Sequence, residues 1–282
     1  MKEMQNNTKD EIAVLDGSVI QHGKLSDRIY VMDFAAKDIP LFIEKLETLA
    51  SQKGYSKIFI KAPLSIKERL LDAGFCQEAE VPHFYPNECG GFFSKFRDPA
   101  RAVNRDDTLT SEVLRVALSK ANEKRQEFDG NLELRRLGKE SAKEIAAVYR
   151  QVFATYPFPI FDPEYIKKTM NESVAYFGAW QDKKLIAVCS AEINKKYGNA
   201  EMTDFATLPS YRGKGLASML LSLAEQEMKG QNLRLLYTIA RARSFGMNIT
   251  FAREGYTYAG TLVNNTNIAG GIETMNVWYK AL

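Results

Sequence analysis

Residues 208–217, LPSYRGKGLA, constrain this chain most, because two glycines there separate a strand-like stretch from an amphipathic helix pattern. Glycine permits a tight turn that leaves backbone N–H groups free, and a helix N-terminus carries a partial positive charge. Arg212 and Lys214 add two cationic donors to the same turn. The segment predicts an anion-binding turn at the start of a helix; the alternative is a plain glycine turn with solvated basic side chains.

Other phosphate and nucleophile motifs fit the sequence less well. The glycine spacing stops at Gly213 and Gly215, and Ser218 stands where a dinucleotide-binding fingerprint would carry its third glycine. That fingerprint also opens the first strand–helix–strand unit of its domain, whereas this segment comes late in the chain. Neither GxxxxGK[ST] nor GxSxG occurs, which excludes a P-loop and a nucleophile elbow.

Composition and charge narrow the class of protein further. The 282 residues are 45% hydrophobic and 26% charged, as in an ordinary globular protein of one large domain or two smaller ones. A formal net charge of +3 is too small to predict a nucleic-acid partner. Residues 185–191 are the longest apolar run, and the N-terminus is polar, so we expect no membrane partner. Three dispersed cysteines and two histidines predict no metal site, and the whole pattern predicts a cytoplasmic protein.

The order of elements is legible after residue 130, where Asp129-Gly130 indicates a turn and a domain boundary. We therefore predict an N-terminal α/β domain at 1–130 and a second domain at 131–282, bridged by a helix over 111–128. The second domain is predicted to run β-α-α-β-β-β-α-β-α-β-β. Its strands are expected at 132–137, 174–180, 184–193, 200–208, 233–239, 256–263 and 273–280.

The two halves share an internal pattern. YSKIFIKAP (55–63), then AGFCQEAEV (73–81), then GGFFSKF (90–96) runs strand, helix, Gly-aromatic, strand, Gly-Gly, strand. LRLLYTIA (233–240), REGYTYAGTL (253–262) and GGIETMNVWYK (270–280) repeat that order. Two interpretations stay open: chance similarity, or an N-terminal half that is a degenerate partial copy without a glycine turn and without cofactor.

With these features in place, the chain resembles the GNAT superfamily of acetyl-CoA-dependent N-acetyltransferases. Residues 212–217 resemble its pyrophosphate loop, and Asn248 with Gly255-Tyr256 resembles its later motif. The resemblance implies an α/β (α+β) fold with a mixed, mostly antiparallel sheet flanked by helices. A closer resemblance is to β-lysine N6-acetyltransferases, through YPFPIFDPEY (156–165), residues 200–220 and GGIETMNVWYK. It implies acetyl transfer from acetyl-CoA to a small amino acid, converting β-lysine to N6-acetyl-β-lysine as a compatible solute.

The same resemblance implies roles for particular residues. Backbone N–H groups near Phe205 and Thr207 would hold the pantetheine arm and polarise the thioester. The implied cofactor-binding set is Phe205, Thr207, Arg212, Gly213, Lys214, Gly215, Leu216, Ala217 and Asn248. Phe251 stands where the superfamily often has a tyrosine that protonates the leaving thiolate; Tyr256, Tyr258 or water are the open substitutes.

A proton acceptor is also needed, because a lysine-type amine has a pKa near 10.4 and must lose a proton before it attacks. Glu201 occupies the strand position of the superfamily base, and Asp204 is the second candidate. Strict alternation places them on opposite faces of a strand unless a bulge intervenes. The alternative is that Glu201 is an ordinary exposed strand residue.

The acceptor pocket is expected at the loop that carries Tyr156, Phe158 and Phe161, because this segment lines the pocket in the superfamily. The alternative is a hydrophobic loop packed on the sheet. Arg241 and Glu273 are weak candidates for the charges an amino acid needs. Other GNAT acceptors (a polyamine, an aminoglycoside, a protein amine), a non-catalytic acyl-CoA sensor, and a homodimer all stay open.

Overall fold

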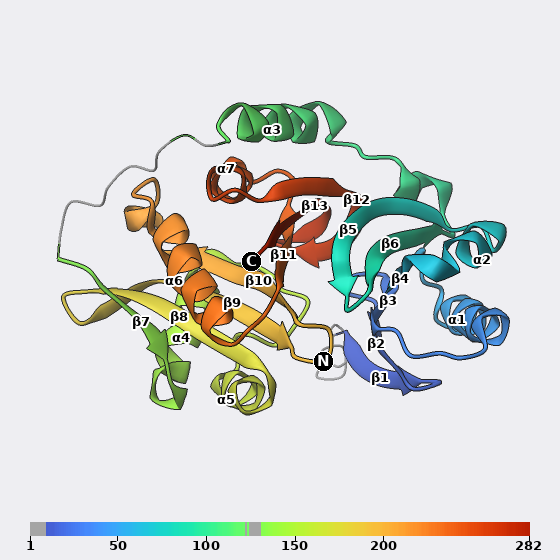
Figure 1. Ribbon diagram of the computed structural model, residues 1–282, viewed down its shortest axis with the longest axis horizontal. Helices are drawn as coiled ribbons and strands as arrows, with labels where there is room; N and C mark the ends of the chain where they lie inside the picture. The colour runs from blue at the N-terminus through green and yellow to red at the C-terminus, as the bar shows by residue number, and fades with distance from the viewer. Residues whose placement is uncertain (1–9, 122, 124–130) are drawn as a thin grey trace, which may run out of the picture.

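One continuous sheet of thirteen strands organises the computed structural model, which describes residues 10–121, 123 and 131–282. The strands lie in the order β1-β2-β3-β4-β6-β5-β12-β13-β11-β10-β9-β8-β7, so each half of the chain builds one end of the sheet (Figure 1). The N-terminal elements are β1 (Glu11–Leu15), β2 (Ser18–Gly23), β3 (Arg28–Asp33), α1 (Ile39–Lys53), β4 (Lys57–Pro63), α2 (Lys67–Asp72), β5 (Cys76–Tyr85), β6 (Glu88–Phe96) and α3 (Asp107–Ser119).

The C-terminal half confirms the predicted element order and the mixed, mostly antiparallel sheet. The elements are β7 (Glu133–Leu137), α4 (Ala142–Val152), α5 (Pro163–Glu172), β8 (Val174–Gln181), β9 (Lys184–Asn194), β10 (Asn199–Thr207), α6 (Leu216–Gly230), β11 (Leu235–Arg241), α7 (Phe245–Arg253), β12 (Thr257–Ile268) and β13 (Gly271–Ala281). Residues 185–191 of β9 are buried, and both α4 and α6 pack against this strand.

The helix predicted over 111–128 has different bounds in the structure. α3 begins at Asp107, whose carboxylate suits the first turn of a helix, and it ends at Ser119. Its buried stripe is Thr110, Val113 and Ala117, and Lys120 follows with no apolar side chain to extend that stripe. Residues 122 and 124–128, like the boundary expected near Gly130, lie outside the described residues. The division into domains at 1–130 and 131–282 stays a prediction.

The two halves repeat one arrangement of elements. β3-α1-β4-α2-β5-β6 has the same order as β10-α6-β11-α7-β12-β13. In the sheet, β3-β4-β6-β5 corresponds to β10-β11-β13-β12, and in each set the first pair of strands is parallel and the others are antiparallel. Among the residues that the structure describes, which begin at residue 10, no element that would correspond to β7, α4 and α5 precedes β1.

Side-chain alternation explains how the N-terminal sheet is used on both faces. Ile29 and Ile58 point to one face and join the apolar cluster around α1. Tyr30 and Phe59, one residue further along each strand, belong to the cluster that fills the C-terminal half. Phe84 also crosses to the C-terminal half, with its ring 4.9 Å from that of Tyr237. The second face of the N-terminal sheet is therefore packed on the C-terminal half rather than on a helix of its own.

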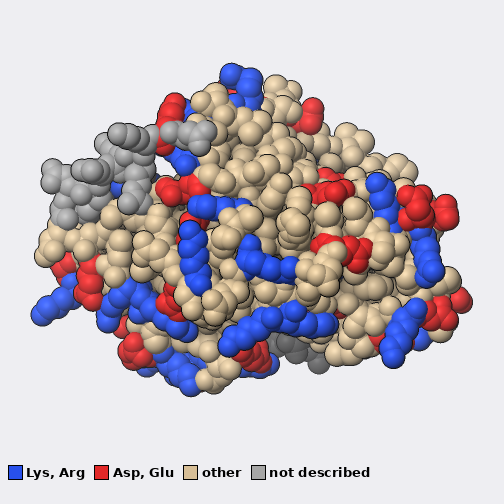
Figure 2. All heavy atoms as spheres, in the orientation of Figure 1, with Lys and Arg blue, Asp and Glu red and all other residues tan. Residues whose placement is uncertain are grey.

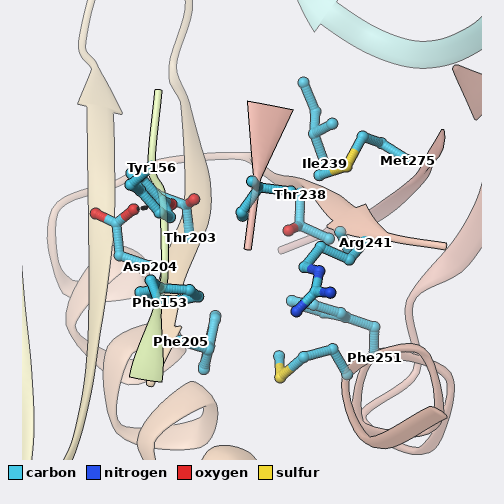
Figure 3. A pocket seen from close by; sticks show the side chains of 13 residues that line it. Phe153, Tyr156, Thr203, Asp204, Phe205, Thr238, Ile239, Arg241, Phe251 and Met275 are labelled. Atoms are coloured by element: carbon cyan, nitrogen blue, oxygen red, sulfur yellow. Dashed lines mark hydrogen bonds between the residues drawn. The ribbon is translucent and has the colours of Figure 1, made fainter. Parts of the chain in front are cut away.

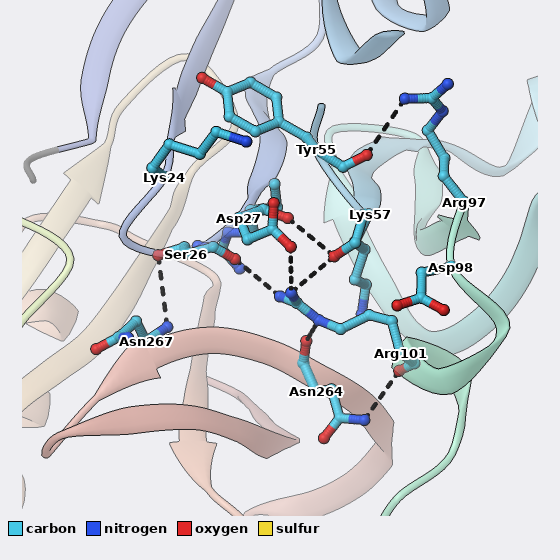
Figure 4. A network of polar contacts seen from close by, with 12 residues as sticks. Lys24, Ser26, Asp27, Tyr55, Lys57, Arg97, Asp98, Arg101, Asn264 and Asn267 are labelled. Atoms are coloured by element: carbon cyan, nitrogen blue, oxygen red, sulfur yellow. Dashed lines mark hydrogen bonds and ion pairs between the residues drawn. The ribbon is translucent and has the colours of Figure 1, made fainter. Parts of the chain in front are cut away.

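The halves join edge to edge where β5 meets β12. Ala79 pairs there with Gly260, which has φ +150°. A Cβ at Gly260 would lie 2.2 Å from the carbonyl oxygen of Glu78, so only glycine allows this approach. Arg101 of the N-terminal half adds a polar contact between the halves by donating to the carbonyl oxygen of Asn264 at 2.8 Å, and it is held in place by the carbonyl oxygen of Ser26 in its own half, also at 2.8 Å (Figure 4).

Acidic and basic side chains are intermingled over the face drawn in Figure 2, in keeping with the formal net charge of +3. Within the described ranges, no helix has the length and apolar composition needed to cross a bilayer.

Candidate active site

The predicted anion-binding turn is formed as expected before α6. Gly213 has φ +77° and Gly215 has φ +75°, a left-handed conformation that other residues rarely adopt. α6 then begins at Leu216, so the N–H groups of its first turn lack intrahelical acceptors and point out of the helix end. Arg212 lies beside them and is exposed. This geometry suits a phosphate group.

A cavity of about 530 Å³ opens directly at this turn. It runs between the end of β10, the start of α6 and α7. Its walls include seven of the predicted cofactor residues: Phe205, Thr207, Arg212, Gly213, Gly215, Leu216 and Ala217. Arg241, Ser244, Gly246 and Arg253 line the opposite side.

Two predicted cofactor residues stand apart from this cavity. Lys214 is exposed and does not line it; its ammonium lies 5.3 Å from the centre of the Tyr211 ring. Asn248 is fully buried, and its amide nitrogen donates to the carbonyl oxygens of Arg241 and Ser244 at 2.9 and 2.8 Å. Its amide oxygen accepts from the side chains of Asn276 and Trp278. The amide is therefore saturated by protein, and Asn248 positions the cavity wall rather than reaching into the cavity.

The two strands at the centre of the site separate after a short paired stretch. β10 and β11 pair in parallel over Asn199–Glu201 and Leu235–Tyr237, and the pairing ends there. β10 remains paired with β9, but its register shifts between Thr203 and Ala206, which marks a β-bulge. Beyond the last pair, the facing edges of β10 and β11 are left to bind something other than each other.

A second, narrower cavity of about 60 Å³ lies in this gap and shares Phe153, Phe205 and Arg241 with the larger one (Figure 3). Thr203 and Asp204 line it from β10, and Thr238 to Arg241 line it from β11. Phe251 closes it from α7, and its ring meets Phe205 edge to face at 5.7 Å. An extended ligand with one end at the glycine turn, running along β10, would place its other end in this gap.

Asp204 sits in the bulge with φ +54° and is 9% exposed. Its carboxylate accepts a hydrogen bond from the hydroxyl group of Tyr156 (Figure 3) and another from that of Ser190 at 2.5 Å. Burial raises the pKa of Asp204, and these hydrogen bonds partly oppose that shift by stabilising the charged form. Both oxygens are thus occupied by protein hydroxyl groups.

Glu201 has a different environment, at the last position where β10 pairs with β11. It is partly exposed, and it lies opposite Glu192 on β9 and Tyr237 on β11. Burial raises the pKa of Glu201, while the nearby Lys61 ammonium and a hydrogen bond from Tyr237 act in the opposite direction. Burial and the charges of Glu201 and Asp204 raise the pKa of Glu192 as well, since two carboxylates in register repel each other.

Three residues of this cluster escape a sequence-based search because the N-terminal half supplies them. Lys61 on β4 donates to the Tyr237 hydroxyl at 3.1 Å and is 7% exposed. Tyr30 lies between Lys61 and Arg28, whose charged groups are 5.2 and 4.8 Å from its ring centre. Nothing in the sequence around these residues distinguishes them from ordinary strand positions.

Of the predicted acceptor-loop residues, Tyr156 lines the narrow cavity. Phe158 and Phe161 pack partly buried against the main core and are not among the lining residues of that cavity or the larger one. Arg241 and Glu273 form a two-fold ion pair with each other at 2.7 and 2.8 Å. Each therefore satisfies the charge of the other, and the charges of an acceptor need different partners.

The sequence profile of the acetyltransferase (GNAT) family matches residues 142–247, which include β10, the glycine turn and α6. A beta-lysine N(6)-acetyltransferase of Methanococcus maripaludis is 38% identical over 271 residues, covering 96% of this chain and 98% of the relative. The chain belongs to the GNAT acetyltransferase family. The N-acetyltransferase YodP of Bacillus subtilis is 32% identical over 94% of this chain and 96% of the relative. A beta-lysine N(6)-acetyltransferase of Methanosarcina mazei is 30% identical over 84% of this chain and 95% of the relative.

As a GNAT, the protein is an N-acetyltransferase, and enzymes of this family use acetyl-CoA as co-substrate. The cavities fit such a molecule in kind: a helix N-terminus with a cationic side chain at one end, and an apolar gap between two strands at the other. Among the described residues, no group of three or more histidine, cysteine, aspartate or glutamate side chains is placed to hold a metal ion.

The leaving thiolate lacks the tyrosine that many GNAT enzymes offer. Phe251 is 1% exposed and lines the narrow cavity with no hydroxyl group. Neither suggested substitute lines the two cavities: Tyr256 is buried behind Phe251, and the Tyr258 hydroxyl contacts that of Thr261 at 2.6 Å. A thiol pKa near 8.5 makes the thiolate a tolerable leaving group without a protein acid.

Proposed function

We propose that this GNAT enzyme transfers the acetyl group of acetyl-CoA to the side-chain amine of β-lysine, giving N6-acetyl-β-lysine. Two relatives that match nearly their whole length carry that activity in their names. The observation that carries the proposal is the mixed-charge cluster at the strand gap, in which Glu192 and Glu201 face Lys61 across the two halves. Carboxylates and a cation placed close together suit the opposite charges of a free amino acid, whereas a protein acceptor needs an open groove.

In this proposal, the pyrophosphate binds at the N-terminus of α6 and the pantetheine arm follows β10 past Thr207 and Phe205. Backbone N–H groups of these two residues then polarise the thioester carbonyl, which needs no side chain. Arg212 adds a cation at the phosphate end. The role of Lys214 is limited to long-range attraction of the phosphates, because it is not among the residues that line the cavity and its ammonium lies over the Tyr211 ring.

A carboxylate removes the proton that the acceptor amine must lose. Once the ammonium has lost one proton, the neutral amine nitrogen attacks the thioester carbon, the C–S bond breaks, and a second N–H proton leaves with the thiolate to give the free thiol. The first proton, lost before the attack, needs an acceptor on the protein. Glu201 accepts that proton, directly or through one water, since its raised pKa suits a base that works near neutral pH. Asp204 is the second candidate, because it lines the narrow cavity itself. Its two hydroxyl donors favour a positioning role for Asp204 instead.

The proposal also includes the biological role, the location and the oligomeric state of the protein. Production of a compatible solute, a cytoplasmic location and a homodimer all stay predictions. Acetylation of a polyamine, an aminoglycoside or a protein amine, and a sensor that binds acyl-CoA without turnover, are the competing functions.

The test is acetyl-CoA turnover against a panel of amines that contains β-lysine, α-lysine, spermidine and a lysine-containing peptide. The proposal expects the highest kcat/KM with β-lysine, and mass spectrometry should place the acetyl group on N6. Binding of acetyl-CoA without turnover of any amine would instead support the sensor. Preferential turnover of spermidine or the peptide would overturn the acceptor assignment while leaving the family intact.

A further inference from the structure

Two buried cations of the N-terminal half, Arg28 and Lys61, face the catalytic half. Arg28 is 4% exposed and Lys61 is 7% exposed, and neither forms an ion pair with any residue that the structure describes. Their neighbour Lys57, on the same sheet face, pairs with Glu78 at 3.1 Å. A buried cation without a counter-ion is costly, so the two unpaired positions require an explanation.

Lys61 already has a role, because its ammonium contacts Tyr237 beside Glu201. Arg28 donates no hydrogen bond to any side chain of the reacting site that the structure describes. Its only protein acceptor among the described residues is the carbonyl oxygen of Asn265, at 2.7 Å from one terminal nitrogen. Its Nε atom is buried with no hydrogen-bond partner in the described part of the chain. Desolvation lowers the pKa of Arg28 to about 10, which still leaves the guanidinium charged at neutral pH.

More buried polar atoms without partners belong to β2 and β12, the strands from which Gln21 and the Asn265 acceptor of Arg28 come. They are Gln21 Oε1, Asn265 Oδ1 and Thr266 Oγ1, each counted within the described residues. Gln21 stands opposite Tyr30 in the β2–β3 pairing, so it shares a sheet face with Arg28. Unsatisfied buried polar groups are rare in native proteins, and a group of four at one seam indicates a missing ligand.

Within this group, Gln21 lies beside the acceptor loop and Arg28 lies near Glu201, and this position indicates the chemistry of the ligand. Gln21 donates at 2.8 Å to the carbonyl oxygen of Pro157, next to Tyr156 in the acceptor loop. Arg28 and Glu201 also lie close enough to interact electrostatically. A molecule that spans the two sites therefore needs an anionic group at one end and an amine at the other. A guanidinium binds a carboxylate through two parallel N–H donors, which would use the free Nε.

We propose that Arg28 of the N-terminal half binds the carboxylate of the acceptor amino acid, with Gln21, Asn265 and Thr266 completing the site. The inference rests on the proposed function and adds that selection of the acceptor lies outside the catalytic half. The four atoms are buried, and the hydrogen bond from Gln21 to the carbonyl oxygen of Pro157 connects them to the acceptor loop.

The experiment compares β-lysine with the same molecule lacking its carboxylate, a diaminopentane, in wild-type enzyme and in Arg28→Gln. A hydrogen-bonded charge pair contributes enough that its loss should raise KM for β-lysine by about ten- to a hundred-fold. The KM for the diaminopentane should stay within about two-fold, because that acceptor never used Arg28. The affinity for acetyl-CoA should also be unchanged.

Arg101→Gln is the matched control, since Arg101 is a second buried arginine at the seam and has Asp27 as its counter-ion. It should affect the two acceptors equally. Arg28→Lys keeps a cation without the two-fold geometry and should recover part of the affinity for β-lysine; it also replaces Arg28→Gln if that variant does not fold. An Arg28 variant that weakens both acceptors by the same factor overturns the inference. A wild-type enzyme that does not acetylate β-lysine overturns the proposed function instead.

Discussion

Glu201 and Asp204 lie three residues apart on β10, and the bulge between Thr203 and Ala206 gives their carboxylates different surroundings. Asp204 is held by two hydroxyl groups, whereas Glu201 is partly exposed beside Lys61 and Tyr237. A base needs a free lone pair at the reacting nitrogen, and a positioning residue does not. This difference makes substitution of Glu201 the informative test.

Glu201→Gln should lower kcat at neutral pH by about 10²- to 10⁴-fold, the usual contribution of general-base assistance. The affinity for acetyl-CoA should be nearly unchanged. Because burial raises the pKa of Glu201, wild-type kcat should increase as pH rises through that value and the carboxylate becomes able to accept a proton. The deficit of the variant should shrink at high pH, where more of the amine arrives deprotonated. A pH–rate profile of both enzymes, with Asp204→Asn as comparison, checks this; an unchanged kcat in Glu201→Gln would transfer the role to Asp204 or water.

Prediction from sequence reaches residues whose placement depends on local chain geometry. The conformation of the turn at Gly213 and Gly215 depends only on neighbouring residues. Glu201 lies on β10, the strand that leads directly to that turn. The sequence could not show that the Asn248 amide is fully hydrogen-bonded, because its four partners come from the 241–244 stretch and from β13. Arg28 and Lys61 were missed because they come more than 130 residues before Glu201, and only the tertiary fold brings them to it.

At the scale of elements, the start of α6 is the feature on which cofactor binding depends. Gly215→Glu would place a side chain and a negative charge at the helix N-terminus, where the proposal puts the pyrophosphate. Acetyl-CoA affinity should fall by at least about ten-fold, measured by calorimetry. Gly215→Ala is the control for the backbone alone, because φ +75° strains any non-glycine residue. If the glutamate variant binds acetyl-CoA as tightly as the wild type, the phosphate site lies elsewhere.

The contact between β5 and β12 is equally specific. Gly260→Ala puts a methyl group 2.2 Å from a backbone oxygen in a conformation that costs about 1–3 kcal/mol by itself. The free energy of unfolding should fall by at least that amount in urea denaturation. Gly230→Ala is a suitable control, since a Cβ there meets nothing within 4 Å. Equal stability of the two variants would mean that the edges of β5 and β12 do not need this close approach.

For the whole molecule, the sequence repeat indicated two related halves but not how they meet. The order strand, helix, Gly-aromatic, strand is a local pattern, and β4–β6 and β11–β13 follow it. The junction depends on one pair, Ala79 with Gly260, and on side chains such as Phe84 that cross to the other half. No periodicity along the chain encodes such a register. The single sheet and the shared core then imply that the halves unfold together.

Lys57 tests that implication, because it lies in the N-terminal half while both tryptophans, Trp180 and Trp278, lie in the C-terminal half. The Lys57 ammonium is buried, pairs with Glu78 at 3.1 Å and donates to the carbonyl oxygen of Val263 at 2.7 Å. Lys57→Ala leaves the Glu78 carboxylate buried and unpaired, which typically costs about 3–5 kcal/mol.

The fall in the free energy of unfolding of Lys57→Ala should be the same by tryptophan fluorescence and by circular dichroism. Both signals should change in one coincident transition in urea, because both halves are expected to form one cooperative unit. Lys37→Ala, at an exposed position of the same half, should leave the transition within about 0.5 kcal/mol of the wild type. A tryptophan transition that stays in place while the circular dichroism splits into two steps would show instead that the catalytic half is stable on its own. In that case the N-terminal half would contribute to the acceptor site without contributing to the stability of the fold around it.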